Sequence, residues 1–166
     1  TSVSAMIGAY LGGRLDDRLG SMRTLKVSIN MSALILVVLT SITPATLFFV
    51  IPVSVEPVWS FPYFNTVAEL AYLATNQAFA LFFVTGLSAS RTLMAKLSPP
   101  AMATQFFGLY GLSGSITAFL APLLVAIVTD ITQSQRFGFA SLVFLILGGG
   151  LMLGWVREEQ ATRAAA

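Results

Sequence analysis

The sequence predicts an all-α fold, a polytopic membrane helix bundle. Hydrophobic residues make up 56% of the 166 positions and charged residues only 10%, whereas soluble domains carry about 25% charged residues. A helix needs about 20 apolar residues, rising about 1.5 Å each, to cross a hydrocarbon core of about 30 Å. Four stretches meet that length, and the lipid bilayer is therefore the expected surrounding. They are residues 25–44, 67–90, 103–130 and 136–156.

Residues 1–15 predict part of a fifth helix. The opening run TSVSAMIGAYLGG is membrane-like, but at the helical rise it would reach only about 20 Å. It has no initiating Met and no basic stretch before its apolar run, so it does not read as a signal peptide. We expect residues 1–166 to form a single transmembrane domain of one partial and four full helices, as a fragment of a longer chain, with a tail at 157–166.

The basic residues predict the orientation. If successive loops alternate between the two sides, one side receives only Arg136. Basic residues select the cytoplasmic side, so the C-terminus should be cytoplasmic and the stretches 52–65 and 131–135 should face outward. We expect an integral protein of the bacterial cytoplasmic (inner) membrane. The other eight basic residues are Arg14, Arg18, Arg23, Lys26, Arg91, Lys96, Arg157 and Arg163.

Several residues predict helix ends and helix packing. Thr66 and Glu69 have capping-box spacing. Ser98, followed by two prolines, predicts the N-cap of the next helix, and Pro122 should bend the helix that contains it. Spaced glycines indicate close helix packing. They are Gly8, Gly12, Gly108, Gly111, Gly114, Gly150 and Gly154.

The stretch GGRLDDRLGSMRTLK, residues 12–26, concentrates charge in an apolar chain. Six of the sixteen charged side chains lie in its last thirteen positions. We expect a short loop between two membrane helices, with Gly20 in the turn and Asp17 paired with Arg18. The pattern also resembles the loop motif of the major facilitator superfamily, in its weaker copy between helices eight and nine. The resemblance implies that the aspartate stabilises one access state. The motif residues are Gly13, Asp17, Arg18, Gly20 and Arg23.

A second resemblance extends over about seventy residues. The segments SRTLMAKLSPP, QFFGLYGLSG, FLAPLL and SQRFG, in this order, are similar to the C-terminal half of the vacuole-effluxer-like branch, whose fungal members export amino acids. The resemblance implies the C-terminal half of a major facilitator fold, helices eight to twelve. Members of the branch often carry a Lys where this chain has Ser115. We expect a secondary transporter that moves a small polar solute, such as an amino acid, by alternating access.

The resemblance also suggests where the solute binds. In the superfamily the tenth helix lines the central cavity, and adjacent amides at mid-span are costly in lipid unless they face water or a partner helix. Interhelical hydrogen bonding is an equally open explanation. Asn76 and Gln77 lie about 100° apart on a helix, and we place Asn76 in the cavity because it shares a face with Tyr72, Phe79 and Phe83. The candidate substrate-binding residues are Tyr72, Thr75, Asn76, Gln77, Tyr110 and Ser113.

The absent residue types narrow the function. The chain contains no His and no Cys, which removes the commonest catalytic and metal-binding groups, so we expect no enzyme, no metal and no cofactor. We expect no nucleic-acid partner either. The expected partners are the solute, the bilayer and the missing N-terminal half, which should also carry any proton-coupling carboxylate. The alternative is a non-transporting membrane scaffold or a degenerate half-transporter module. Upstream coding sequence would separate the two.

Overall fold

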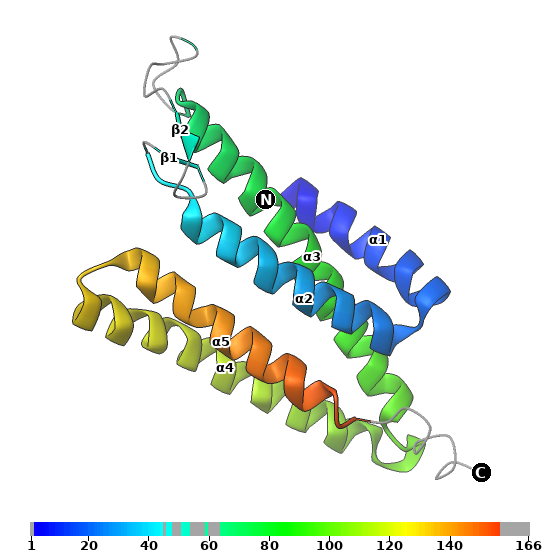
Figure 1. Cartoon of the computed structure of the whole chain (residues 1–166). Coiled ribbons are helices and arrows are strands. Elements are labelled where there is room, and N and C mark those ends of the chain that lie inside the picture. Colours follow the sequence, from blue (N-terminus) through cyan, green and yellow to red (C-terminus); the bar gives the residue numbers. More distant parts are fainter. Residues whose placement is uncertain (1, 45, 48–50, 54–58, 60–63, 157–166) are drawn as a thin grey trace.

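Five helices dominate the computed structural model, which describes residues 2–44, 46–47, 51–53, 59 and 64–156 (Figure 1). The tail at 157–166 and most of the predicted outer loop at 52–65 lie outside the described residues. Four of the helices are long and apolar enough to cross a membrane, which confirms the predicted all-α membrane bundle. The elements are α1 (Ser2–Leu19), α2 (Ser21–Ser41), β1 (Thr46–Leu47), β2 (Ile51–Pro52), α3 (Val67–Leu97), the 3-10 helix η1 (Pro100–Met102), α4 (Ala103–Thr132) and α5 (Gln135–Leu153).

The turn between α1 and α2 is shorter than expected. The charged stretch is helical on both sides of Gly20, so the prediction of a charged loop and of a helix beginning near residue 25 was wrong. Gly20 has φ 83°, a conformation that costs glycine little and other residues more. Arg and Lys are good helix formers, and charge alone therefore did not end the helix. One glycine makes the whole turn.

The helix α3 continues past residue 90, where the prediction ended it, to Leu97. Prolines 99 and 100 then stop it, because a residue before proline avoids helical backbone angles. Ser98 is the C-cap of α3, not the N-cap of the following helix: its N–H and its hydroxyl both donate to the Met94 carbonyl, at 3.0 and 2.7 Å. The predicted capping box of Thr66 and Glu69 at the other end of α3 is confirmed.

The remaining helix ends differ from the predictions by one to three residues. The helix α2 ends at Ser41 rather than near 44, since Pro44 excludes helix before it, and a two-residue antiparallel β1–β2 pair follows. The helix α4 runs on to Thr132 and ends at Gln133 in a left-handed conformation, φ 53°. The helix α5 begins at Gln135 and ends at Leu153, not near 156.

Small residues let α1, α2 and α3 pack closely. A Cβ on Gly8 would come within 2.6 Å of the Leu81 carbonyl oxygen, and one on Gly12 within 3.1 Å of the Thr85 Cα. The Thr85 hydroxyl contacts the Gly8 carbonyl oxygen at 2.9 Å, a hydrogen bond between α1 and α3. The predicted packing role of Gly8 and Gly12 is therefore confirmed. The face of α2 against α3 includes a row of small polar residues, Ser21, Thr24, Ser28 and Ser32, all buried.

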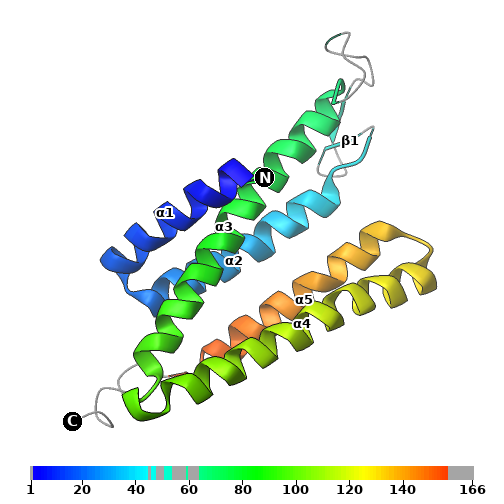
Figure 2. The same ribbon diagram turned by 180° about the vertical axis from the view of Figure 1, so that it is seen from behind.

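The helices α4 and α5 form an antiparallel hairpin that lies along α2 through α5 (Figures 1 and 2). Gly138 allows the close approach, because a Cβ there would meet the Val125 carbonyl oxygen at 2.9 Å and also the Thr129 hydroxyl. The helix α4 has no buried residue in the described structure. A Cβ added at Gly108, Gly111 or Gly114 would meet nothing within 4 Å. Their predicted packing partner is therefore not among the described residues.

Candidate functional site

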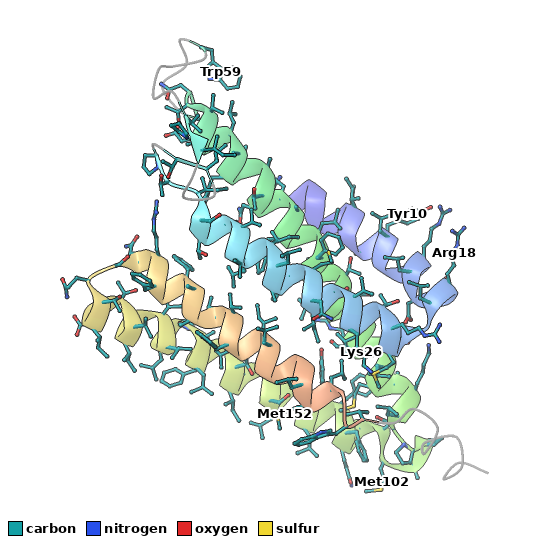
Figure 3. The ribbon with its side chains drawn as sticks, in the orientation of Figure 1. Tyr10, Arg18, Lys26, Trp59, Met102 and Met152 are labelled. Atoms are coloured by element: carbon teal, nitrogen blue, oxygen red, sulfur yellow. The ribbon has the colours of Figure 1, made fainter. Side chains whose placement is uncertain are left out.

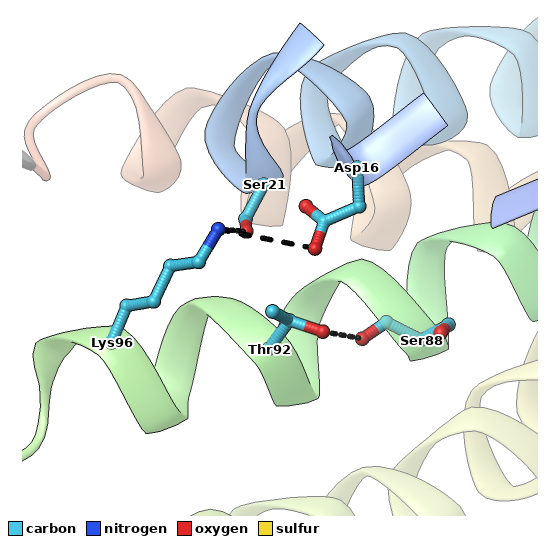
Figure 4. Close-up of polar contacts among 5 residues, drawn as sticks. All are labelled: Asp16, Ser21, Ser88, Thr92 and Lys96. Atoms are coloured by element: carbon cyan, nitrogen blue, oxygen red, sulfur yellow. Dashed lines mark hydrogen bonds and ion pairs between the residues drawn. The ribbon is translucent and has the colours of Figure 1, made fainter. Parts of the chain in front are cut away.

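A polar cluster joins the α1–α2 turn to the end of α3. The Lys96 ammonium donates a hydrogen bond of 2.6 Å to the Ser21 hydroxyl and lies 3.9 Å from a carboxylate oxygen of Asp16 (Figure 4). This is the one ion pair in the described part of the chain. Asp17 and Arg18, the pair expected from the sequence, are both exposed and form no such bridge. The aspartate before the motif aspartate makes the structural contact instead.

The Asp16 side chain is largely buried, with 11% of its surface exposed, whereas Lys96 is 48% exposed. The second carboxylate oxygen, Oδ1, is buried and has no hydrogen-bond partner among the described residues. A buried carboxylate is costly unless it is paired. The positive charge of Lys96 offsets part of the cost of burying the Asp16 carboxylate. The pairing ties the first two helices to the third across eighty positions of sequence.

The five motif residues lie around this cluster without entering it. Gly13 has open space where a Cβ would be, and Asp17, Arg18 and Arg23 are exposed. Arg18 projects from the bundle at the end of α1 (Figure 3). Helical periodicity separates Asp16 from Asp17 by about 100°, so one faces α3 and the other faces away. Sequence reasoning missed Asp16, and the adjacent pair of aspartates was the only available signal.

One face of α3 carries the predicted aromatic and amide residues and lies away from the packed face. Tyr72 is 45% and Phe83 48% exposed, and Asn76 is half-buried. Phe79 stacks on Phe83 with ring centroids 5.7 Å apart. The opposite side of α3 is buried against α1 and α2, through residues such as Ala89, 1% exposed. The structure thus brings Tyr72, Asn76, Phe79 and Phe83 onto one partly exposed surface, which we call the α3 aromatic face.

Thr75 and Gln77 lie outside the α3 aromatic face. The Thr75 hydroxyl donates to the Ala71 carbonyl at 2.7 Å, a bond within the helix that satisfies it. Gln77 is half-buried and lies about 100° from Asn76 around the helix. The six candidates are therefore not one cluster.

Tyr110 and Ser113 lie on α4. The Tyr110 hydroxyl and the Ser90 hydroxyl are 2.7 Å apart and form a hydrogen bond between α3 and α4. The Ser113 hydroxyl donates to the Tyr110 carbonyl at 2.8 Å, and Ser113 is exposed. Ser90 lies five turns along α3 from Tyr72 on the same side of the helix. Tyr110 therefore holds α4 against one end of the surface that begins at Tyr72.

A cavity of about 510 Å³ lies where α2 ends and where α3 and α5 begin. Tyr72, Glu69 and Arg136 are among the residues that line it. A guanidinium nitrogen of Arg136 donates to the Ile42 carbonyl at 3.0 Å. Ile42 is the C-cap of α2, so this bond gives a hydrogen-bond donor to a carbonyl at the end of that helix. Arg136 of α5 thus contacts the end of α2 across 94 positions of the sequence.

Comparison with known proteins finds similar sequences among membrane transporters. The family model described as "Vacuole effluxer Atg22 like" matches residues 1–166. An MFS-type transporter of Bacillus subtilis, YxiO, is 36% identical over 73 residues, which are 44% of this chain and 17% of that protein. Autophagy-related protein 22 of Cryptococcus neoformans is 33% identical over 87 residues, 52% of this chain and 16% of its own length.

The matched region thus spans less than a fifth of these curated relatives. No solved structure matches the chain. The family model, in contrast, extends over every residue, and four of the helices that it covers are long and apolar enough to cross a membrane. The chain therefore belongs to the vacuole effluxer Atg22-like family of major facilitator membrane transporters.

Proposed function

We propose that this chain is the C-terminal half of a secondary transporter that moves a small polar solute by alternating access. The observation that carries the proposal is the α3 aromatic face, on which Tyr72 and Phe83 are 45% and 48% exposed. An amide between aromatic rings suits a small solute with both polar and apolar parts. Asn76 would donate and accept hydrogen bonds to the solute, and Tyr72 and Phe83 would contact its apolar part. An amino acid is such a solute.

The N-terminal half of the same transporter would supply the opposite wall of the pathway. The exposed surfaces of α3 and α4 leave room for it, and the Ser90–Tyr110 bond closes the gap between them at one end. Substrate sites in such transporters lie at the interface of the two repeats, near the bilayer midplane. Asn76, ten residues into α3, is about 15 Å from its start at the helical rise, which is midplane depth.

The exposed motif aspartate would act between the two halves. Asp16 binds within this half, through Lys96, so Asp17 remains available to meet a group of the other half and stabilise one access state. The excess of basic residues at this end favours a cytoplasmic location for it and for the C-terminus. We place the protein in the bacterial cytoplasmic membrane.

Transport by the full-length protein tests the role of Asn76. Asn76→Ala should raise the apparent substrate constant at near-normal protein levels, because an interhelical hydrogen bond in a membrane protein contributes only about 0.6 kcal/mol and its loss would not unfold the bundle. Gln77→Ala is the matched control, with the same chemistry one residue on, and should mainly lower thermal stability in detergent. The measurement is the rate at which radiolabelled amino acids enter or leave proteoliposomes that contain each variant.

The reverse pattern would assign the pathway to Gln77. If neither substitution changed transport or stability, helix packing would be the favoured role of both amides. A scaffold or degenerate module would show no transport with any tested solute, and a start codon just before Thr1 would support it, whereas an in-frame extension that encodes about seven further helices would support the transporter.

A further inference from the structure

A second cavity, of about 250 Å³, lies between α2 and α5 near the end of the bundle that carries the α1–α2 turn. It is lined by Lys26, Ile29 and Asn30 from α2 and by Leu147, Gly150 and Leu151 from α5. We call it the α2–α5 groove. None of these residues belongs to the candidate pathway, which lies on α3 and α4. Figure 3 shows Lys26 and Met152, the residue after Leu151, at the same end of the bundle.

The groove has an apolar floor and one charged end. Leu147 and Leu151 are 43% and 76% exposed, and Gly150 lets α5 approach α2, because a Cβ there would lie 3.0 Å from a methyl group of Ile29. The Asn30 amide donates to the Lys26 carbonyl at 2.9 Å, which holds the two polar residues together. An apolar slot with a cation at one end matches the shape and polarity of a phospholipid.

The cation is available for a ligand. Lys26 is exposed, and its ammonium has no carboxylate within 4.0 Å in the described part of the chain. Arg23 lies one turn nearer the helix end, is also exposed and shares that side of α2 with Lys26. Arg23 and Lys26 thus lie at the same depth along the bundle as the end of α5, where Trp155 is 85% exposed. Exposed Trp is typical of the membrane–water interface.

We infer that the α2–α5 groove binds one anionic phospholipid of the leaflet at the basic end of the bundle. The Lys26 ammonium and the Arg23 guanidinium would contact the headgroup phosphate, and an acyl chain would lie over Ile29, Leu147 and Leu151. Basic pockets between membrane helices on the cytoplasmic side favour anionic headgroups. The inference does not depend on which solute is transported.

Native mass spectrometry of the full-length protein with dioleoylphosphatidylglycerol tests the site. Lys26→Gln should weaken binding of the first lipid about fivefold, the effect of about 1 kcal/mol for one basic residue near the membrane surface. Arg91→Gln is the matched control, since Arg91 is an exposed cation of α3 at the same end and should change binding less than twofold. Leu147→Trp, which leaves the charge unchanged but fills the groove, should also weaken it.

Three results would overturn the inference. Equal losses in Lys26→Gln and Arg91→Gln would show diffuse electrostatic attraction rather than a site. Equal binding of phosphatidylcholine would remove the requirement for an anionic headgroup. Competition by inorganic phosphate alone would show that the acyl groove contributes nothing. Because these readouts measure lipid and not transport, they are independent of the Asn76 experiment.

Discussion

Gly8→Ala measures how tightly α1 packs on α3. The added Cβ would lie 2.6 Å from the Leu81 carbonyl oxygen, a backbone atom that cannot rotate away, so the helices must separate. Overpacking costs about 1–3 kcal/mol, and separation also weakens the Thr85 hydrogen bond to the Gly8 carbonyl, worth about 0.6 kcal/mol. Replacing glycine by alanine in a helix returns about 1 kcal/mol.

Gly13→Ala is the matched control, because it lies on the same helix and a Cβ there meets nothing within 4 Å. It receives the helix-propensity gain without the clash. The difference between the two variants should therefore be about 2–4 kcal/mol, with Gly8→Ala the less stable. Thermal unfolding of the full-length protein in detergent measures it, as a midpoint several degrees lower. Equal midpoints would show that α1 does not pack on α3 as described.

Two further predictions concern the charged turn and the orientation. Asp16→Asn should lower the thermal midpoint, because it removes the carboxylate charge that pairs with Lys96, whereas Asp17→Asn should leave the midpoint unchanged and impair transport; the opposite assignment would make Asp17 the structural residue. Cysteines at the exposed positions Gln133 and Arg23 should react with an impermeant maleimide on intact cells only at 133, and labelling at 23 without permeabilisation would invert the proposed topology.

The number and type of the helices could be predicted from the sequence because span length and composition are local properties. The ends were less predictable where charge and helix propensity disagree. Residues 16–19 and 91–97 are charged or lie next to charged residues, yet both segments are helical. Glycine and proline gave the true limits, at Gly20 and at Pro99. Turn chemistry was therefore a better guide to helix ends than polarity.

The contacts of the candidate site could not be predicted in the same way. Lys96 contacts Asp16 and Ser21, and Arg136 contacts Ile42, over separations of 75 to 94 residues. No local pattern encodes such pairings, since they depend on how the helices are arranged in space. The α3 aromatic face was predictable because residues on one helix share a face by periodicity alone. That α1 and α2 pack on the other side of α3 was not predictable in this way.

The exposed state of α4 has a consequence for how the protein is made. The helices α1 and α2 pack mainly on α3, which follows them in the chain. The main partner of α4 is α5, which follows it in the chain. Until α5 is made, the contact described for α4 is with one end of α3, through Ser90 and Tyr110, and α4 is the most apolar of the four candidate spans. Its apolar composition thus makes α4 compatible with the bilayer before α5 has been synthesised.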